Sequence, residues 1–140
     1  MKKIIILGLL VGLVWSCTVD NGSDDNIRFE ILPIASFDVP DTLEAGNLNR
    51  INYAYYLPSD CHSFNNLYYI ESGNQRTIAV VNTVVENNTA LGCQTLIEEL
   101  DERHFDVMAP FGFNSLVFNV WQGEDESGQD VYLTIEVPIE

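Results

Sequence analysis

The sequence predicts an all-β protein, an immunoglobulin-like, antiparallel β-sandwich of about seven strands. From residue 27 onward, apolar and polar side chains alternate with a period of two, which is typical of strands with one buried face. Glycine, proline, asparagine and aspartate interrupt this alternation at short intervals, as turns between strands do. The chain that follows the N-terminal signal is long enough for one hydrophobic core, so we expect a single sandwich domain.

The N-terminus has the pattern of a bacterial export signal. Two lysines precede an uninterrupted apolar run at residues 4–15, and Ser16 and Cys17 follow. This run is too short to span a bilayer, which takes roughly 20 residues. A small residue before cysteine resembles a lipobox, although Trp15 stands where a small residue is usual. We therefore expect a lipoprotein signal peptide at residues 1–16 and lipid attachment at Cys17; an ordinary cleaved signal or an uncleaved anchor is the alternative.

Residues 17–26 form a polar, acidic stretch without apolar periodicity, and we expect a flexible tether there. Its aspartates resemble the acidic segment that accompanies export to the outer cell surface in many Bacteroidota lipoproteins, and a solvated spacer is the plainer alternative. The sequence thus predicts an outer-membrane lipoprotein that faces outward, with its folded domain at residues 27–140.

The charge of the chain excludes several classes of partner. Both lysines lie in the signal, so four arginines stand against all 21 acidic residues in the remainder. A chain this acidic lacks the basic patch that nucleic-acid binding requires. Anionic lipid headgroups would repel it as well, so attachment to a membrane would depend on the lipid at Cys17.

The first half of the domain contains four expected strands. Residues 29–39 alternate but contain Pro33, so they predict a first, edge strand. Residues 51–57 alternate with one buried face, and residues 67–71 predict a short aromatic strand. Residues 77–85 are rich in β-branched side chains, which indicates a buried strand.

Residues 95–103 are ambiguous between helix and strand. Thr95 and Glu98 fit a capping box, and Glu99 and Arg103 form a favourable helical pair. We expect a short helix near residues 95–101, followed by a strand that carries Phe105 and Val107 on one face.

Two strictly alternating runs near the C-terminus, residues 116–121 and 131–137, predict the last two strands. The side chains expected to face inward are Leu116, Phe118, Val120, Val131, Leu133, Ile135 and Val137. The same alternation sends Trp121 and Tyr132 outward. These two rings could bind a sugar or a protein partner, or they could pack across the strands and cover the sheet.

Cys61 and Cys93 are an even pair once Cys17 is lipidated, and in an oxidising compartment they predict a disulfide between two loops. Closing a loop of this length is worth roughly 3–4 kcal/mol in the chain-entropy model. A metal site built from Asp60, Cys61 and His62 is the alternative, but it lacks the recurring spacing of zinc ligands.

No motif in the sequence specifies catalysis, a cofactor or a metal. His62 and His104 are the only histidines; neither lies in a nucleophile-elbow sequence, and we expect both on the surface. A pair of carboxylates suited to hydrolysis could form by chance, but a solvated acidic surface is commoner. The loop at residues 123–130 could offer oxygens to calcium but lacks the EF-hand register, so a plain hairpin is expected. Asp41-Thr42-Leu43 matches the pattern at which Bacteroidota attach O-linked glycans, or is an ordinary turn.

The domain resembles small surface lipoproteins of the Bacteroidota that carry an immunoglobulin-like sandwich. The residues that carry this resemblance are Cys61, Phe64, residues 76–80, Cys93, residues 118–125, residues 128–133 and residues 136–138. The resemblance implies a lipid-anchored β-sandwich, and it implies no catalytic residue.

The sequence therefore predicts a monomeric, lipid-anchored cell-envelope protein that acts as a non-enzymatic binding or accessory module, with a glycan or an envelope protein as its partner. A carbohydrate-binding accessory protein that uses Trp121 and Tyr132 is the second hypothesis, and a carboxylate-based hydrolase is the third.

Overall fold

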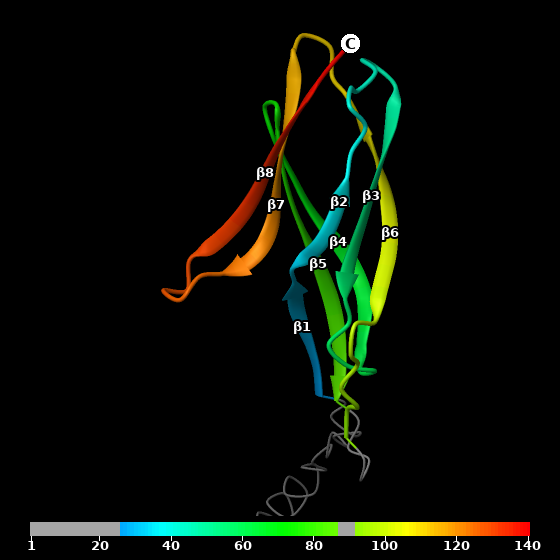
Figure 1. The fold of residues 1–140 in the computed structure, drawn as a ribbon, viewed down its shortest axis with the longest axis vertical. Helices are drawn as coiled ribbons and strands as arrows, with labels where there is room; N and C mark the ends of the chain where they lie inside the picture. The colour runs from blue at the N-terminus through cyan, green and yellow to red at the C-terminus, as the bar shows by residue number, and fades with distance from the viewer. Residues whose placement is uncertain (1–25, 87–91) are drawn as a thin grey trace, which may run out of the picture.

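The computed structural model describes residues 26–86 and 92–140, and these residues form a two-sheet β-sandwich (Figure 1). The described strands are β1 (Asn26–Leu32), β2 (Ile34–Asp38), β3 (Leu48–Tyr56), β4 (His62–Ser72), β5 (Gln75–Glu86), β6 (Leu100–Met108), β7 (Ser115–Glu124) and β8 (Asp130–Pro138). The prediction of an all-β sandwich is confirmed, with eight described strands in place of about seven. Cys17 and the expected signal and tether lie almost wholly outside the described residues.

The strands divide into a large and a small sheet. The large sheet has the order β4-β5-β7-β8, and β1 pairs with β5; the small sheet has the order β2-β3-β6. All pairings between these strands are antiparallel except that of β5 with β7, where residues 75–78 run parallel to residues 117–120. This parallel pair departs from the fully antiparallel arrangement expected from the sequence, and an immunoglobulin-like topology is not confirmed.

Pro33 separates two strands where the sequence predicts one at residues 29–39. β1 pairs with β5 in the large sheet, whereas β2 pairs with β3 in the small sheet. Proline has no backbone N–H to donate to a ladder, so the chain leaves one sheet at this residue and enters the other. The expectation of one continuous strand is therefore wrong, but the expected edge position holds, because β1 and β2 each lie at the edge of a sheet. The segment links the two sheets.

The β7–β8 hairpin projects sideways from the sandwich (Figure 1). β7 stops pairing with β5 at Val120, because β1 occupies the same edge of β5 from Val80 onward. A bulge between Trp121 and Gly123 then bends β7 outward, with Gly123 at a φ of 114° that favours glycine. As a result, the end of this hairpin has no sheet opposite it.

The hydrophobic core lies between the two sheets; its buried residues run from Leu32 to Val137, and Ile139 packs against them. Fully buried side chains with no exposed surface include Leu43, Tyr55, Ile51, Ile78, Val80, Leu116, Phe118 and Val120. The expected inward face of residues 116–121 is thus confirmed. In β8 the expectation holds for Val137, which is buried, but is wrong for Val131 and Leu133, which are 42% and 46% exposed because they lie on the projecting hairpin.

The expected short helix at residues 95–101 is wrong. Glu98 has a φ of 56°, outside the right-handed helical region, and β6 begins at Leu100. The backbone of this segment instead bonds to the segment before β4: Leu96 N–H donates to Pro58, and Leu57 N–H donates to Glu99. Tertiary pairing has thus overridden the local helical signal. Among the described residues there is no helix long and apolar enough to cross a membrane.

Candidate functional site

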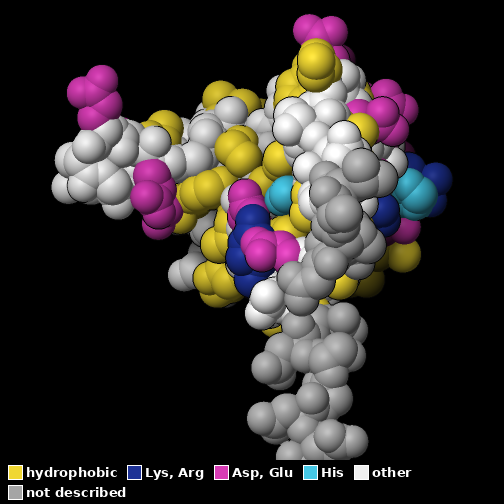
Figure 2. All heavy atoms as spheres, turned by 90° about the horizontal axis from the view of Figure 1, so that it is seen from below, with side chains coloured by type: hydrophobic (Ala, Val, Ile, Leu, Met, Phe, Trp, Pro, Cys, Tyr) yellow, Lys and Arg dark blue, Asp and Glu magenta, His cyan; other side chains and the backbone are white. Residues whose placement is uncertain are grey.

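The two sheets differ in the chemistry of their outer faces, the faces turned away from the core. The centre of the small sheet's outer face is polar: Asn52 lies opposite His104, and Arg50 Nε lies 3.2 Å from Asp106 Oδ1. The outer face of the large sheet carries an apolar face, which consists of Ile27, Phe29, Ile31, Tyr68, Ile70, Val81, Val85, Trp121 and Tyr132. Figure 2 shows hydrophobic side chains at the surface between the body of the sandwich and the projecting hairpin.

Three rings of the apolar face form an aromatic row across the large sheet. Tyr68 lies opposite Ala79, and Trp121 lies opposite Tyr132. The β5–β7 ladder ends one residue earlier, at Ile78 and Val120, so Ala79 and Trp121 come next in the same row. Tyr68 and Tyr132 are 45% and 42% exposed, and Trp121 is half-buried. Ala79 lies between Tyr68 and Trp121, and because its side chain is a single methyl group, the rings project beyond it.

A carboxylate orients the aromatic row. Trp121 Nε1–H donates to Asp130 Oδ1 at 2.8 Å, which holds the indole in one orientation. Partial burial, the Asp130 carboxylate and the neighbouring Tyr68 raise the pKa of Tyr132, so the two tyrosines lie within electrostatic range of each other. The outward direction expected for Trp121 and Tyr132 is confirmed.

Hydrogen-bonding groups lie in the row next to the aromatic one. Asn119 lies opposite Thr134, and Thr134 Oγ1 donates to Asn119 Oδ1 at 3.1 Å. Asn119 Nδ2 lies 3.4 Å from Gln75 Oε1. The rings thus have amide and hydroxyl groups beside them, which is the combination of an apolar platform and directional partners that ligand sites use.

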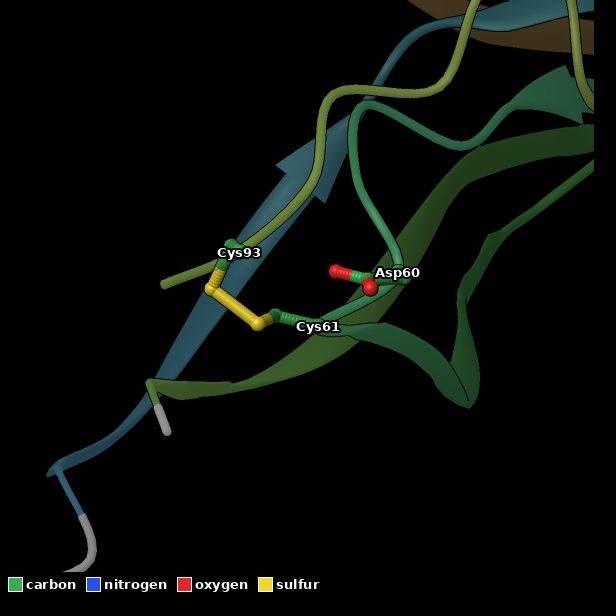
Figure 3. Close-up of side chains that lie close together, drawn as sticks. All are labelled: Asp60, Cys61 and Cys93. Carbon is green, nitrogen blue, oxygen red and sulfur yellow. A yellow bond between two sulfur atoms is a disulfide. The ribbon is translucent and has the colours of Figure 1, made fainter. Parts of the chain in front are cut away.

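The Cys61–Cys93 disulfide is present and joins two loops, as expected (Figure 3). Cys61 directly precedes β4, and Cys93 lies in the segment before β6. Asp60 lies beside the bridge, and its carboxylate and the two sulfurs are within 4.8 Å of one another. Zinc binds thiolates, whereas both sulfurs are used in the bridge, and Asp60 Oδ1 accepts a hydrogen bond from Gln94 N–H at 2.8 Å. The expected alternative of Asp60, Cys61 and His62 as metal ligands therefore does not fit this arrangement.

The side chain of His62 is only 6% exposed, so the expectation that it lies on the surface is wrong. His104 is exposed, as expected. His62 Nδ1 lies 2.8 Å from Ser59 Oγ, and His62 Nε2 lies 3.3 Å from Glu30 Oε2. These contacts resemble a serine–histidine–carboxylate relay, for which the sequence gives no signal because Glu30 lies 32 residues away from His62.

The surroundings of Ser59 favour a structural role for this cluster. Acyl transfer is assisted by hydrogen-bond donors aimed at the developing oxyanion, which are commonly the backbone N–H groups near the nucleophile. The N–H of Asp60 donates to Gln94 O, that of Cys61 to Ser59 Oγ, and that of His62 to Ser59 O. The amides next to Ser59 are therefore already used, and the cluster fastens the turn before β4 to β1.

The acidic loop between β7 and β8 is a self-contained hairpin turn. Asp125 Oδ1 accepts hydrogen bonds from Ser127 N–H, Ser127 Oγ and Gln129 N–H at 2.6–3.0 Å. These bonds lower the pKa of Asp125, with the Ser127 hydroxyl as the largest cause. Backbone hydrogen bonds from Asp125 N–H to Gln129 O and from Gly128 N–H to Asp125 O close the loop, in agreement with the hairpin expected from the sequence.

Thr42 is half-exposed and lies between exposed Asp41 and fully buried Leu43.

Comparison of the chain with protein-family models, with curated proteins and with solved structures finds no match.

Proposed function

We propose that the protein is a lipid-anchored lipoprotein of the cell envelope and that its domain is a non-enzymatic binding module. The apolar face of the large sheet is the binding surface. The observation that carries this proposal is the contrast between the two outer faces. The small sheet is polar at its centre and exposes large apolar side chains only at its two ends, namely Leu48, Met108, Tyr56 and Leu100. The large sheet exposes six large apolar side chains, namely Ile27, Phe29, Ile31, Tyr68, Ile70 and Tyr132.

A contiguous apolar patch on a soluble domain supports a role in binding, because leaving it in water costs free energy that a partner recovers. The chain as a whole is strongly acidic, so an outer face that carries mainly apolar side chains stands out against the composition of the protein. The absence of free amides at Ser59 argues against the relay of Glu30, Ser59 and His62 as a hydrolytic site.

The observation that supports the lipid anchor is the Ser16-Cys17 junction at the end of the apolar run. Replacement of Cys17 by serine should move the protein from the membrane fraction to the soluble fraction and abolish incorporation of labelled fatty acid. Membrane retention of the Cys17→Ser variant with unchanged lipid label would overturn this part of the proposal.

Carbohydrate is the ligand class that the aromatic row favours. Sugar rings stack their C–H faces on tryptophan and tyrosine, while their hydroxyls need acceptors and donors such as Asp130 and Asn119. The indole held by Asp130 is pre-oriented, which reduces the entropy lost on binding. A protein partner is the second candidate, favoured by the aliphatic side chains of β1 in the same face.

The test is a glycan array probed with residues 18–140, which contain every described strand and the whole core. Trp121→Ala and Tyr132→Ala should each abolish binding to any glycan that the unaltered domain retains, because loss of an interface aromatic commonly costs about 2 kcal/mol or more. Tyr56→Ala is the matched control, since Tyr56 is 54% exposed on the small sheet. No glycan bound, or equal loss in all three variants, would overturn carbohydrate as the ligand.

A further inference from the structure

β1 has an edge that no strand among the described residues occupies. One edge of β1 pairs with β5 over its whole length without a bulge, and its other edge is unpaired. Three side chains of β1 belong to the apolar face: Ile27, Phe29 and Ile31 are 56%, 67% and 50% exposed. A regular, apolar edge strand is a template for a further strand, and natural proteins usually protect such edges.

The sequence of β1 is complementary to itself. Around Phe29 the chain reads Ile-Arg-Phe-Glu-Ile, with Arg28 and Glu30 at symmetric positions. If two copies pair antiparallel about a two-fold axis at Phe29, each Ile27 lies opposite the other copy's Ile31, and each Arg28 lies opposite the other copy's Glu30. Apolar residues then meet on one face and opposite charges on the other, which is the arrangement that stabilises cross-strand pairs.

We propose that two copies of this protein associate through their β1 strands, in antiparallel register centred on Phe29. The pairing joins the two large sheets into one continuous sheet, and a two-fold interface of this kind closes with two subunits. This proposal replaces the monomer expected from the sequence.

The charges of β1 are placed so that they can bridge the two copies. Within one copy, Arg28 Nη1 lies 2.6 Å from Glu86 Oε1, and Glu30 contacts both Arg28 and His62 through its Oε2 atom. Arg28 and Glu30 are half-exposed, with side-chain exposures of 50% and 38%. The contacts of Glu30 within its own copy use Oε2. Its other oxygen, Oε1, can therefore accept a hydrogen bond from the other copy's arginine while those contacts are kept.

The other unpaired edges in the described part of the chain are less suited to self-pairing. The register of β2 and that of β4 shift at a bulge, and β8 pairs with β7 across a third bulge. Bulges twist an edge and so oppose the addition of a strand. β6 is regular but carries three acidic residues, Asp101, Glu102 and Asp106, against the single Arg103, so pairing of two copies would bring a net excess of like charge together.

The pairing would also place the two apolar faces side by side. Phe29 is nearest to the two-fold axis, and the aromatic rows would lie at either side of it on the same surface. A ligand of sufficient length could then contact both rows at once, which raises its avidity without any new contact within one copy.

Cysteine cross-linking in the full-length protein in its own membrane tests the register. Phe29→Cys should form an intermolecular disulfide, because directly opposed residues have Cβ atoms about 4.5–5.5 Å apart. Ile27→Cys should not link to itself, since four residues along a strand separate the two copies by about 14 Å, beyond the reach of a disulfide at about 7 Å. Co-expressed Ile27→Cys and Ile31→Cys chains should link to each other.

Ile70→Cys is the matched control, because Ile70 is 46% exposed on β4 at the opposite edge of the same sheet. Non-reducing electrophoresis and mass spectrometry of the linked peptides give the readout. The proposal is overturned if Phe29→Cys gives no dimer, or if Ile27→Cys and Ile70→Cys give as much dimer as Phe29→Cys.

A charge exchange tests the interface independently, by sedimentation of residues 18–140. Arg28→Glu places carboxylates opposite each other and should weaken dimerisation by about tenfold or more, and Arg28→Glu combined with Glu30→Arg should restore it. Glu86→Gln is the control, because it removes the ion pair of Arg28 within one copy and leaves the facing charges unchanged. A chain that stays monomeric at high concentration, or a double variant as weak as the single one, contradicts the proposal.

Discussion

Trp121 Nε1 donates a hydrogen bond to Asp130 Oδ1 at 2.8 Å, and this contact links the two strands of the projecting hairpin. Trp121 is the only tryptophan in residues 18–140, because the other, Trp15, precedes that fragment. Intrinsic fluorescence of that fragment therefore reports on this one ring.

We predict that Asp130→Ala shifts the fluorescence emission of Trp121 to longer wavelength, because the released indole becomes more exposed to water. Circular dichroism should show that the strands remain intact. Glu126→Ala, in the exposed loop of the same hairpin, should leave the emission unchanged. Identical spectra for Asp130→Ala and the unaltered domain would show that the hydrogen bond does not hold the ring.

Two buried asparagines should respond oppositely to the same substitution. Asn82 has no exposed surface, and neither its Nδ2 nor its Oδ1 has a hydrogen-bond partner among the described residues. Asn49 accepts from Glu44 N–H and donates to Glu44 O and Asn47 O. A buried unsatisfied polar group costs about 1–3 kcal/mol, so Asn82→Leu should raise the melting temperature by several degrees. Asn49→Leu should lower it, because it leaves the partners of Asn49 unpaired. A lower melting temperature for both variants would contradict this assignment.

Loss of the disulfide should destabilise the fold without changing it. The bridge spans 32 residues of sequence separation, for which the chain-entropy model gives roughly 3–4 kcal/mol. Replacement of both Cys61 and Cys93 by serine should lower the free energy of unfolding by about that amount in urea titrations. A double variant as stable as the unaltered domain would contradict the prediction, as would two free thiols in protein purified from its own cells without reductant.

Stability should fall in the alkaline range. Burial raises the pKa of Tyr69 to about 12 from its ordinary value of 10.0, with Glu71 adding to the rise and Arg76 opposing it. The unfolded chain therefore loses this proton near pH 10 while the folded chain keeps it, so the contribution is fully present below pH 10 and is lost as the pH rises through about 12.

Tyr69→Phe should make the alkaline loss of stability shallower, because phenylalanine does not titrate. Tyr55→Phe should act in the same direction, since burial and the adjacent Asp101 raise the pKa of Tyr55. Urea unfolding at intervals across this range measures the slope, and curves that stay parallel to that of the unaltered domain would contradict the prediction.

The strands were predictable where burial on one face is complete, and not where tertiary contacts compete with the local pattern. Leu116, Phe118 and Val120 alternate and are all fully buried, as expected. The helical signal at residues 95–101 is real but local, and backbone bonds to the segment before β4 prevail over it. Exposure of Val131 and Leu133 depends on where β1 displaces β7 from β5, which no local pattern records.

The candidate site was predictable for Trp121 and Tyr132, because alternation alone determines their side of the sheet. Tyr68 was missed. The same alternation in residues 67–71 turns the half-buried Leu67 and Tyr69 toward the core and sends Tyr68 to the other face of the strand. The contact of His62 with Glu30 could not be found, since it depends on the pairing of β1 and β4 with opposite edges of β5.

The passage of the chain through Pro33 from the large sheet to the small one has a mechanical consequence. β1 runs antiparallel to β5 and ends where β2 begins, so a force applied at Asn26 along the strand axis loads the β1–β5 hydrogen bonds in shear. All the bonds of that ladder then resist together, and the load that passes Pro33 is taken up by the second sheet. A domain pulled from this end should therefore hold its fold against drag better than one whose first strand peels away one bond at a time.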